Sequence, residues 1–161
     1  MSKFYLTTAI AYVNAPPHIG HALEFIQADA LARYHRLKGD DTFFLTGTDE
    51  HGVKIYETAK EQGIATKELV DKNAEKFKAL RTILDLSNDD FIRTSSDLHK
   101  RGAKKIWNKM LEKGDIYKGV YKGLYCAGCE AFVSEKDLDE KGQCPNHKKK
   151  PEVLEEENFF F

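Results

Sequence analysis

Four consecutive residues, His18-Ile19-Gly20-His21, have the types and spacing that suit the binding of a phosphate group. They follow a short apolar run and two prolines, and a helical pattern begins at Ile19. The first N–H groups of a helix lack partners within the helix, and the positive end of its dipole lies there, so anions bind at this end. Gly20 leaves room for a nucleotide, and both imidazoles could donate hydrogen bonds to phosphate oxygens. The alternative is two ordinary histidines at a helix start, but the strand–turn–helix context favours phosphate.

A second set of side chains has the spacing of metal ligands. Cys126 and Cys129 are separated by two residues, and Cys144 and His147 form another close pair. Three thiolates and a neutral imidazole suit a tetrahedral Zn²⁺ ion, whereas three cysteines cannot all form disulfides with one another. The alternative is three buried cysteines and a surface histidine. Four protein ligands leave no open coordination position, so the predicted zinc is structural.

A carboxylate, Asp49, follows the apolar run over residues 42–46. Open α/β sheets bind ligands beyond the carboxyl ends of their strands, so Asp49 could receive a substrate ammonium group. It could instead cap a helix that begins at Val53, and the two roles could coexist. His51 could be a substrate contact or a loop histidine. Tyr12 could belong to the core, but its position beside the phosphate turn favours a pocket wall.

The elements that would position these groups alternate between strand and helix patterns. A strand, a crossover helix and a strand form the unit of a parallel sheet, so we expect residues 4–10 and 42–46 to pair in parallel. Gly47 is expected to close the second strand. The pattern changes near residue 115 to alternating aromatic and small or charged residues, which is typical of hairpin strands. We therefore expect two domains, residues 1–115 and 116–161.

The composition excludes several classes of protein. The 161 residues include 25 basic and 26 acidic side chains, so any RNA contact requires a local patch rather than overall basicity. The mean hydropathy is −0.56, and no apolar run approaches the roughly 20 residues that span a bilayer. Because no signal-peptide core is present, we expect a cytoplasmic protein without membrane contact. The aromatic end, Phe159 to Phe161, resembles a strand whose partner lies outside the chain.

Two of these segments resemble a known family. Residues 9–21, which read Ala-Ile-Ala-Tyr-Val-Asn-Ala-Pro-Pro-His-Ile-Gly-His, resemble the opening of class I aminoacyl-tRNA synthetases, and residues 45–52 are similar to the second-strand segment of the methionine-specific member. The family also carries a zinc knuckle in its connective peptide. The resemblance implies an α/β fold. It would comprise the first half of a Rossmann-like parallel-sheet nucleotide-binding domain and a small zinc-knuckle connective-peptide subdomain.

The resemblance to methionyl-tRNA synthetase also implies a function. Methionine would be activated by ATP, arriving with Mg²⁺, to methionyl-adenylate and then transferred to tRNA(Met). The catalytic residues would be His18 and His21, which would bind ATP together with Gly20. The methionine site would include four residues, namely Ala9, Ile10, Tyr12 and Asp49.

The chain departs from the family in one respect, because the second signature, Lys-Met-Ser-Lys-Ser, is absent. We therefore expect the chain to be weak or inactive alone, and to self-associate or pair with the missing C-terminal half. Two alternatives remain. The first is another nucleotidyltransferase of the His-x-Gly-His type. The second is an inactive zinc-knuckle fragment that binds RNA or a protein partner.

Overall fold

The computed structural model describes residues 2–129 and 131–161 and forms two compact units, Met1–Lys104 and Lys105–Phe161. Helix α4 (Asp97–Lys113) runs across this division. The domain boundary expected at residue 115 stays a prediction. Within the described ranges, no helix is both long enough and apolar enough to cross a membrane.

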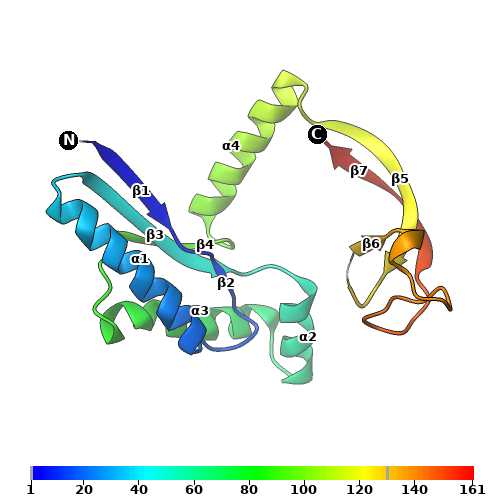
Figure 1. Ribbon diagram of the computed structural model, residues 1–161, viewed down its shortest axis with the longest axis horizontal. Helices are drawn as coiled ribbons and strands as arrows, with labels where there is room; N and C mark the ends of the chain where they lie inside the picture. Colours follow the sequence, from blue (N-terminus) through cyan, green and yellow to red (C-terminus); the bar gives the residue numbers. More distant parts are fainter. Residues whose placement is uncertain (1, 130) are drawn as a thin grey trace. The chain divides into compact units, whose positions relative to one another are not determined.

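The first unit is built on a parallel sheet. Its strands are β1 (Lys3–Thr7), β2 (Ala11–Tyr12), β3 (Asp41–Asp49) and β4 (Asp90–Arg93). Strand β3 is central, because Leu45 pairs with Thr7 on one side and with Asp90 on the other, and all pairings are parallel (Figure 1). The predicted parallel pairing of the first two strand segments is confirmed.

The first predicted strand, residues 4–10, is interrupted by a bulge. Thr7 pairs with Leu45 and Ala11 pairs with Thr48, so three residues, 8–10, face two on β3. The N–H group of Ala9 has no place in the ladder and donates to Glu24 Oε1 at 2.7 Å. Such an extra residue re-aims the side chains that follow it. The prediction of one continuous strand was therefore wrong in its second half.

The prediction that Gly47 ends the second strand was also wrong, because β3 continues to Asp49. A Cβ atom at Gly47 would lie 2.1 Å from the carbonyl oxygen of Ile92 on β4. Glycine is required here for the close approach of two strands rather than for a turn.

Three helices lie wholly within the first unit: α1 (Ile19–Leu37), α2 (Val53–Glu61) and α3 (Thr66–Ile83). Helix α1 lies along β1 and β3 (Figure 1), and its Ala28 and Ala32 pack on Phe44. The main core joins the turn after β2 to all three helices through Val13, Phe25, Ile55, Ala59, Leu69, Val70, Phe77 and Leu86. The predicted start of a helix at Ile19 is confirmed, and this core fixes the place of that start.

The second unit is an antiparallel sheet with β5 (Tyr117–Cys126) between β6 (Ala131–Val133) and β7 (Glu152–Phe160), together with a 3-10 turn over Glu135–Asp137. Phe160 pairs with Tyr117. Phe159 pairs with Lys118 and meets the Trp107 ring edge-on at 5.0 Å. The aromatic end therefore has its strand partner within this chain, and the prediction of an absent partner was wrong. The expected self-association loses that support.

Candidate functional site

The turn between β2 and α1 is held from both sides. Val13 directly follows β2 and is fully buried. Its carbonyl oxygen accepts a hydrogen bond from Asn73 Nδ2 of α3 at 2.8 Å. A buried carbonyl needs such a partner, and this bond fixes the path of the chain toward the two prolines. The turn that leads from the end of β2 to the start of α1 is thereby anchored on α3.

Both histidines of the turn cap the helix through the same ring atom. His18 is the N-cap residue, and its Nδ1 accepts the N–H of Gly20 at 3.0 Å. His21 Nδ1 accepts the N–H of His18 at 3.2 Å. Because Nδ1 is an acceptor in each ring, the proton of each neutral imidazole resides on Nε2. The two rings, with centroids 3.8 Å apart, therefore carry two N–H donors beside one helix start.

Electrostatics keep His21 in the neutral form. Burial lowers the pKa of His21, the nearby His18 lowers it further, and Glu24 opposes them with a smaller effect. The edge of the Phe77 ring contributes to the apolar surroundings, at 5.0 Å between centroids. A neutral ring keeps Nδ1 as the helix cap and Nε2–H as a donor. A Cβ atom at Gly20 would come within 2.9 Å of the His18 ring, so glycine makes room for this arrangement.

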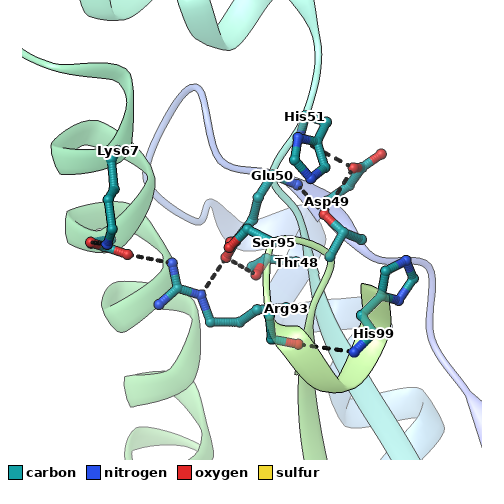
Figure 2. Close-up of polar contacts among 11 residues, drawn as sticks. Thr48, Asp49, Glu50, His51, Lys67, Arg93, Ser95 and His99 are labelled. Carbon is teal, nitrogen blue, oxygen red and sulfur yellow. Dashed lines mark hydrogen bonds and ion pairs between the residues drawn. The ribbon is translucent and has the colours of Figure 1, made fainter. Parts of the chain in front are cut away.

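Asp49 ends β3 directly beside Tyr12, its partner in the parallel ladder. The ring of Tyr12 also passes close to Gly52, where a Cβ atom would lie 3.7 Å from Cε1. Figure 2 shows His51 close to Asp49, and the His51 N–H group donates to Asp49 Oδ1 at 3.5 Å. Gly52, with φ of 135°, is the N-cap of α2 and has no side-chain cap, so the alternative role of Asp49 as that cap is not observed.

The other residues predicted for the methionine site lie in the bulge that precedes Tyr12. Ala9 is held by Glu24 of α1, and Ile10 and Tyr12 are exposed. Sequence analysis missed Glu24, although it follows His21 by three residues and therefore shares its helix face. The bulge leads directly to Tyr12, which lies beside Asp49 at the carboxyl end of β3.

A buried ion-pair network behind Asp49 was also missed. The side chain of Glu50 is fully buried and accepts hydrogen bonds from Arg93 Nε at 2.6 Å, Thr48 Oγ1 at 2.8 Å and the Ser95 hydroxyl (Figure 2). Burial raises the pKa of Glu50, but these hydrogen bonds outweigh it and hold the pKa below its ordinary value. An acidic residue next to the apolar strand was the available signal, because a buried charge requires a partner.

The second unit brings all four predicted metal ligands together, with their donor atoms within 4.8 Å of one another. His147 Nδ1 lies 3.3, 3.7 and 3.9 Å from the sulfur atoms of Cys129, Cys144 and Cys126, and the Cys129 and Cys144 sulfurs are 3.5 Å apart. Zn–S bonds of about 2.3 Å and Zn–N bonds of about 2.0–2.1 Å in a tetrahedron require ligand separations of about 3.6–3.8 Å. The cluster could therefore hold a tetrahedral zinc ion.

The surroundings of the cluster agree with a metal centre. Gly128 lies under the imidazole of His147, where a Cβ atom would be 2.4 Å from Cγ. The hydrogen bond from the His147 ring lowers the pKa of Cys144 to about 6, whereas the neighbouring Cys144 raises the pKa of Cys129 to about 11. Closely spaced thiols therefore oppose one another's ionisation, whereas a bound Zn²⁺ ion would favour the thiolate form of each. The alternative of simply buried thiols leaves the half-buried Cys129 unexplained.

Comparison with protein families gives a match to the model described as tRNA synthetases class I (M), over residues 4–157. The chain is 49% identical over 162 aligned positions to the methionine–tRNA ligase of Thermotoga maritima, covering 99% of this chain and 26% of that protein. It is 46% identical to the ligase of Brucella suis, covering 99% of this chain and 32% of the relative. The chain thus spans about a quarter to a third of the curated relatives that it matches.

Solved structures give the same correspondence. The Mycobacterium tuberculosis methionyl-tRNA synthetase in complex with methionyl-adenylate matches with a TM-score of 0.84 and 40% identity, over 100% of this chain and 32% of that one. A leucyl-tRNA synthetase (LeuRS) of Agrobacterium radiobacter, in a ternary complex with tRNA, matches with a TM-score of 0.75 and 18% identity. The second likeness shows a shared fold only.

Proposed function

The chain belongs to the class I tRNA synthetase family of the methionine type, and from that premise we propose that it is part of a methionine–tRNA ligase. Its residues would take part in the ATP-dependent activation of methionine to methionyl-adenylate and in transfer to tRNA(Met), acting in the cytoplasm. The parallel pairing of Tyr12 with Asp49 carries this proposal. Because of this pairing, Asp49, the candidate acceptor of the ammonium group, lies at the end of the sheet where the chain leaves Tyr12 and turns toward His18.

The proposed ATP site is the start of α1. The Nε2–H groups of His18 and His21 would donate to phosphate oxygens, and Gly20 would allow the nucleotide to approach. Attack of the methionine carboxylate on the α-phosphorus builds charge on these oxygens in the transition state, where fixed donors are most effective. Mg²⁺ would arrive with ATP and bind mainly through phosphates and waters.

The proposed methionine site is the adjoining surface. Asp49 would accept the substrate ammonium group, and Ala9, Ile10 and Tyr12 would form one wall beside it. Within residues 2–129 and 131–161, no lysine, arginine or histidine forms an ion pair with Asp49, so its charge is available to a ligand. A charge-assisted hydrogen bond from the ammonium would orient the carboxylate of methionine toward ATP.

The proposed zinc would be held by Cys126, Cys129, Cys144 and His147. It would supply no chemistry to the reaction, because four protein ligands leave it no open position. Its role would be to keep the end of β5 and the loop that precedes β7 folded as one knuckle.

The test is ATP–pyrophosphate exchange by the full-length ligase that contains these residues. We expect exchange that depends on methionine, and we expect Asp49→Asn to raise the KM for methionine at least tenfold. Asp41→Asn, at the exposed opposite end of β3, is the matched control and should leave this KM unchanged. Exchange without methionine dependence would favour another nucleotidyltransferase, and no exchange would favour a binding module.

The activity of the chain alone is a separate proposal. We expect residues 1–161 to show exchange close to background, with recovery when the remaining part of the ligase is added in trans. Full exchange by the isolated chain would contradict this expectation.

A further inference from the structure

A single hydroxyl group links the carboxylate of Asp49 to the interior of the protein. Thr94 is 7% exposed, and its Oγ1 accepts the N–H of Glu50 at 2.8 Å. The same oxygen lies 3.4 Å from Asp49 Oδ1. The Glu50 N–H occupies one lone pair of the Thr94 hydroxyl oxygen. The single hydrogen of the hydroxyl is then donated to Asp49 Oδ1.

The position of this hydroxyl is fixed by the network around Glu50. The Glu50 side chain is 0% exposed and is held by Arg93, Thr48 and Ser95. Arg93 also binds Asp71 of α3, because its Nη2 donates to Asp71 Oδ1 at 2.6 Å. Figure 2 shows the Arg93 guanidinium reaching from β4 toward α3. The end of β3, strand β4 and helix α3 are therefore tied together immediately behind Asp49.

The groups that hold the Asp49 carboxylate carry no charge. The guanidinium of Arg93 is shared by the carboxylates of Glu50 and Asp71, so its positive charge is already balanced. Asp49 receives neutral donors instead, namely the Thr94 hydroxyl and the His51 N–H. Neutral donors orient a carboxylate without cancelling its charge, which is the state that an incoming ammonium group needs.

We propose that Thr94, held in place by the ion pairs of Glu50, Arg93 and Asp71, is a positioning residue that orients the Asp49 carboxylate toward the ammonium group of the substrate. This inference rests on the proposed function, because it assumes that Asp49 binds an amino acid. Thr94 would not touch the substrate and would act only through Asp49.

The test uses two probes that differ only in the ammonium group. L-Methioninol carries the methionine side chain, an amino group and an alcohol, and 4-(methylthio)butan-1-ol lacks the amino group. Each is measured as a competitive inhibitor of methionine-dependent exchange by the full-length ligase. We expect Thr94→Val, which keeps the side-chain volume but deletes the hydroxyl, to raise the Ki of methioninol about tenfold and that of the deamino alcohol less than twofold.

Two further variants control for structure. Thr94→Ser keeps the hydroxyl and should restore most of the preference for methioninol. Thr42→Val makes the same chemical change near the start of β3, where the threonine hydroxyl donates to the Asp40 carbonyl at 3.3 Å, and should leave the ratio of the two Ki values unchanged. If Thr94→Val does not fold, Thr94→Ala deletes the same hydroxyl and is judged by the same ratio.

The outcomes separate this inference from the proposed function. An equal rise in both Ki values would show general damage to the pocket, and no rise in either would show that Thr94 does not orient Asp49; each result overturns the inference. A wild-type ligase that does not discriminate between the two probes would instead remove the ammonium-binding role of Asp49.

Discussion

Removal of zinc should unfold the knuckle of the second unit and leave the first unit intact. Among the described residues of the second unit, the buried apolar side chains are Ile116, Cys126 and Cys144, and two of these are proposed metal ligands. Full burial of an apolar side chain contributes about 1.5–3 kcal/mol, so Ile116 alone stabilises this unit weakly. Structural zinc in comparable small sites binds with about 10–16 kcal/mol. We therefore expect a bound zinc ion to dominate the stability of the knuckle.

The assay is hydrogen exchange followed by mass spectrometry, before and after treatment with a strong chelator. Elemental analysis should first find one equivalent of zinc in protein purified without chelators. After chelation, we expect residues 126–129 and 131–149 to lose protection, while the core around Phe25 and Phe77 keeps its protection. Cys129→Ser should have the same effect, and Ser134→Ala, which alters a capping hydroxyl in the knuckle but no ligand, should not.

Two results would refute this reasoning. The first is protein that contains no zinc although it is folded. The second is unchanged protection of the knuckle after the metal has been removed, since the few buried apolar groups would then be sufficient. Loss of protection throughout both units would contradict the independent stability of the first unit.

Three further predictions concern the first unit. If His21 acts as a fixed transition-state donor, His21→Asn in the full-length ligase should raise the activation barrier by about 2.7–4 kcal/mol and so lower kcat for activation, with little change in the KM for methionine. An unchanged kcat would exclude His21 from the site. Because the pKa of His21 is lowered by folding from 6.5, the unfolded chain binds more protons below about pH 6.5, and the free energy of unfolding should fall as the pH decreases through this region. Denaturant titrations between pH 5 and 8 should show that His21→Asn removes this part of the pH dependence, and an identical slope in the variant would disprove it. Gly47→Ala should destabilise the first unit by at least about 1–3 kcal/mol, because its Cβ atom would meet the backbone of Ile92 at 2.1 Å; a melting temperature equal to that of the wild type would contradict the close approach of β3 and β4.

Local patterns were sufficient to predict the elements that carry the chemistry. The prolines before His18 and the periodicity after Ile19 predicted the helix start, and the spacing of the cysteine pairs predicted a cluster of four ligands. The helix start and each ligand pair are signals that span only a few residues, where propensity and spacing determine the structure. The roles of the individual residues in binding substrates stay predictions.

The missed features depend on contacts between distant segments. Glu50 is paired by Arg93, and Phe160 by Tyr117, each through a partner some forty residues away that no local period identifies. Gly47 was interpreted as a strand end because glycine commonly ends strands, whereas the carbonyl of Ile92 gives the actual reason. Tertiary contacts of this kind override local preference.

The bulge over residues 8–10 makes the length of this segment matter more than its composition. If the register of β1 with β3 continued through this segment without the bulge, Tyr12 would pair with Glu50 rather than with Asp49. A shift by one position exchanges the two faces of a strand, so the aromatic ring would turn to the opposite side of the sheet. The one extra residue of the bulge therefore absorbs the difference in register and leaves Tyr12 beside Asp49.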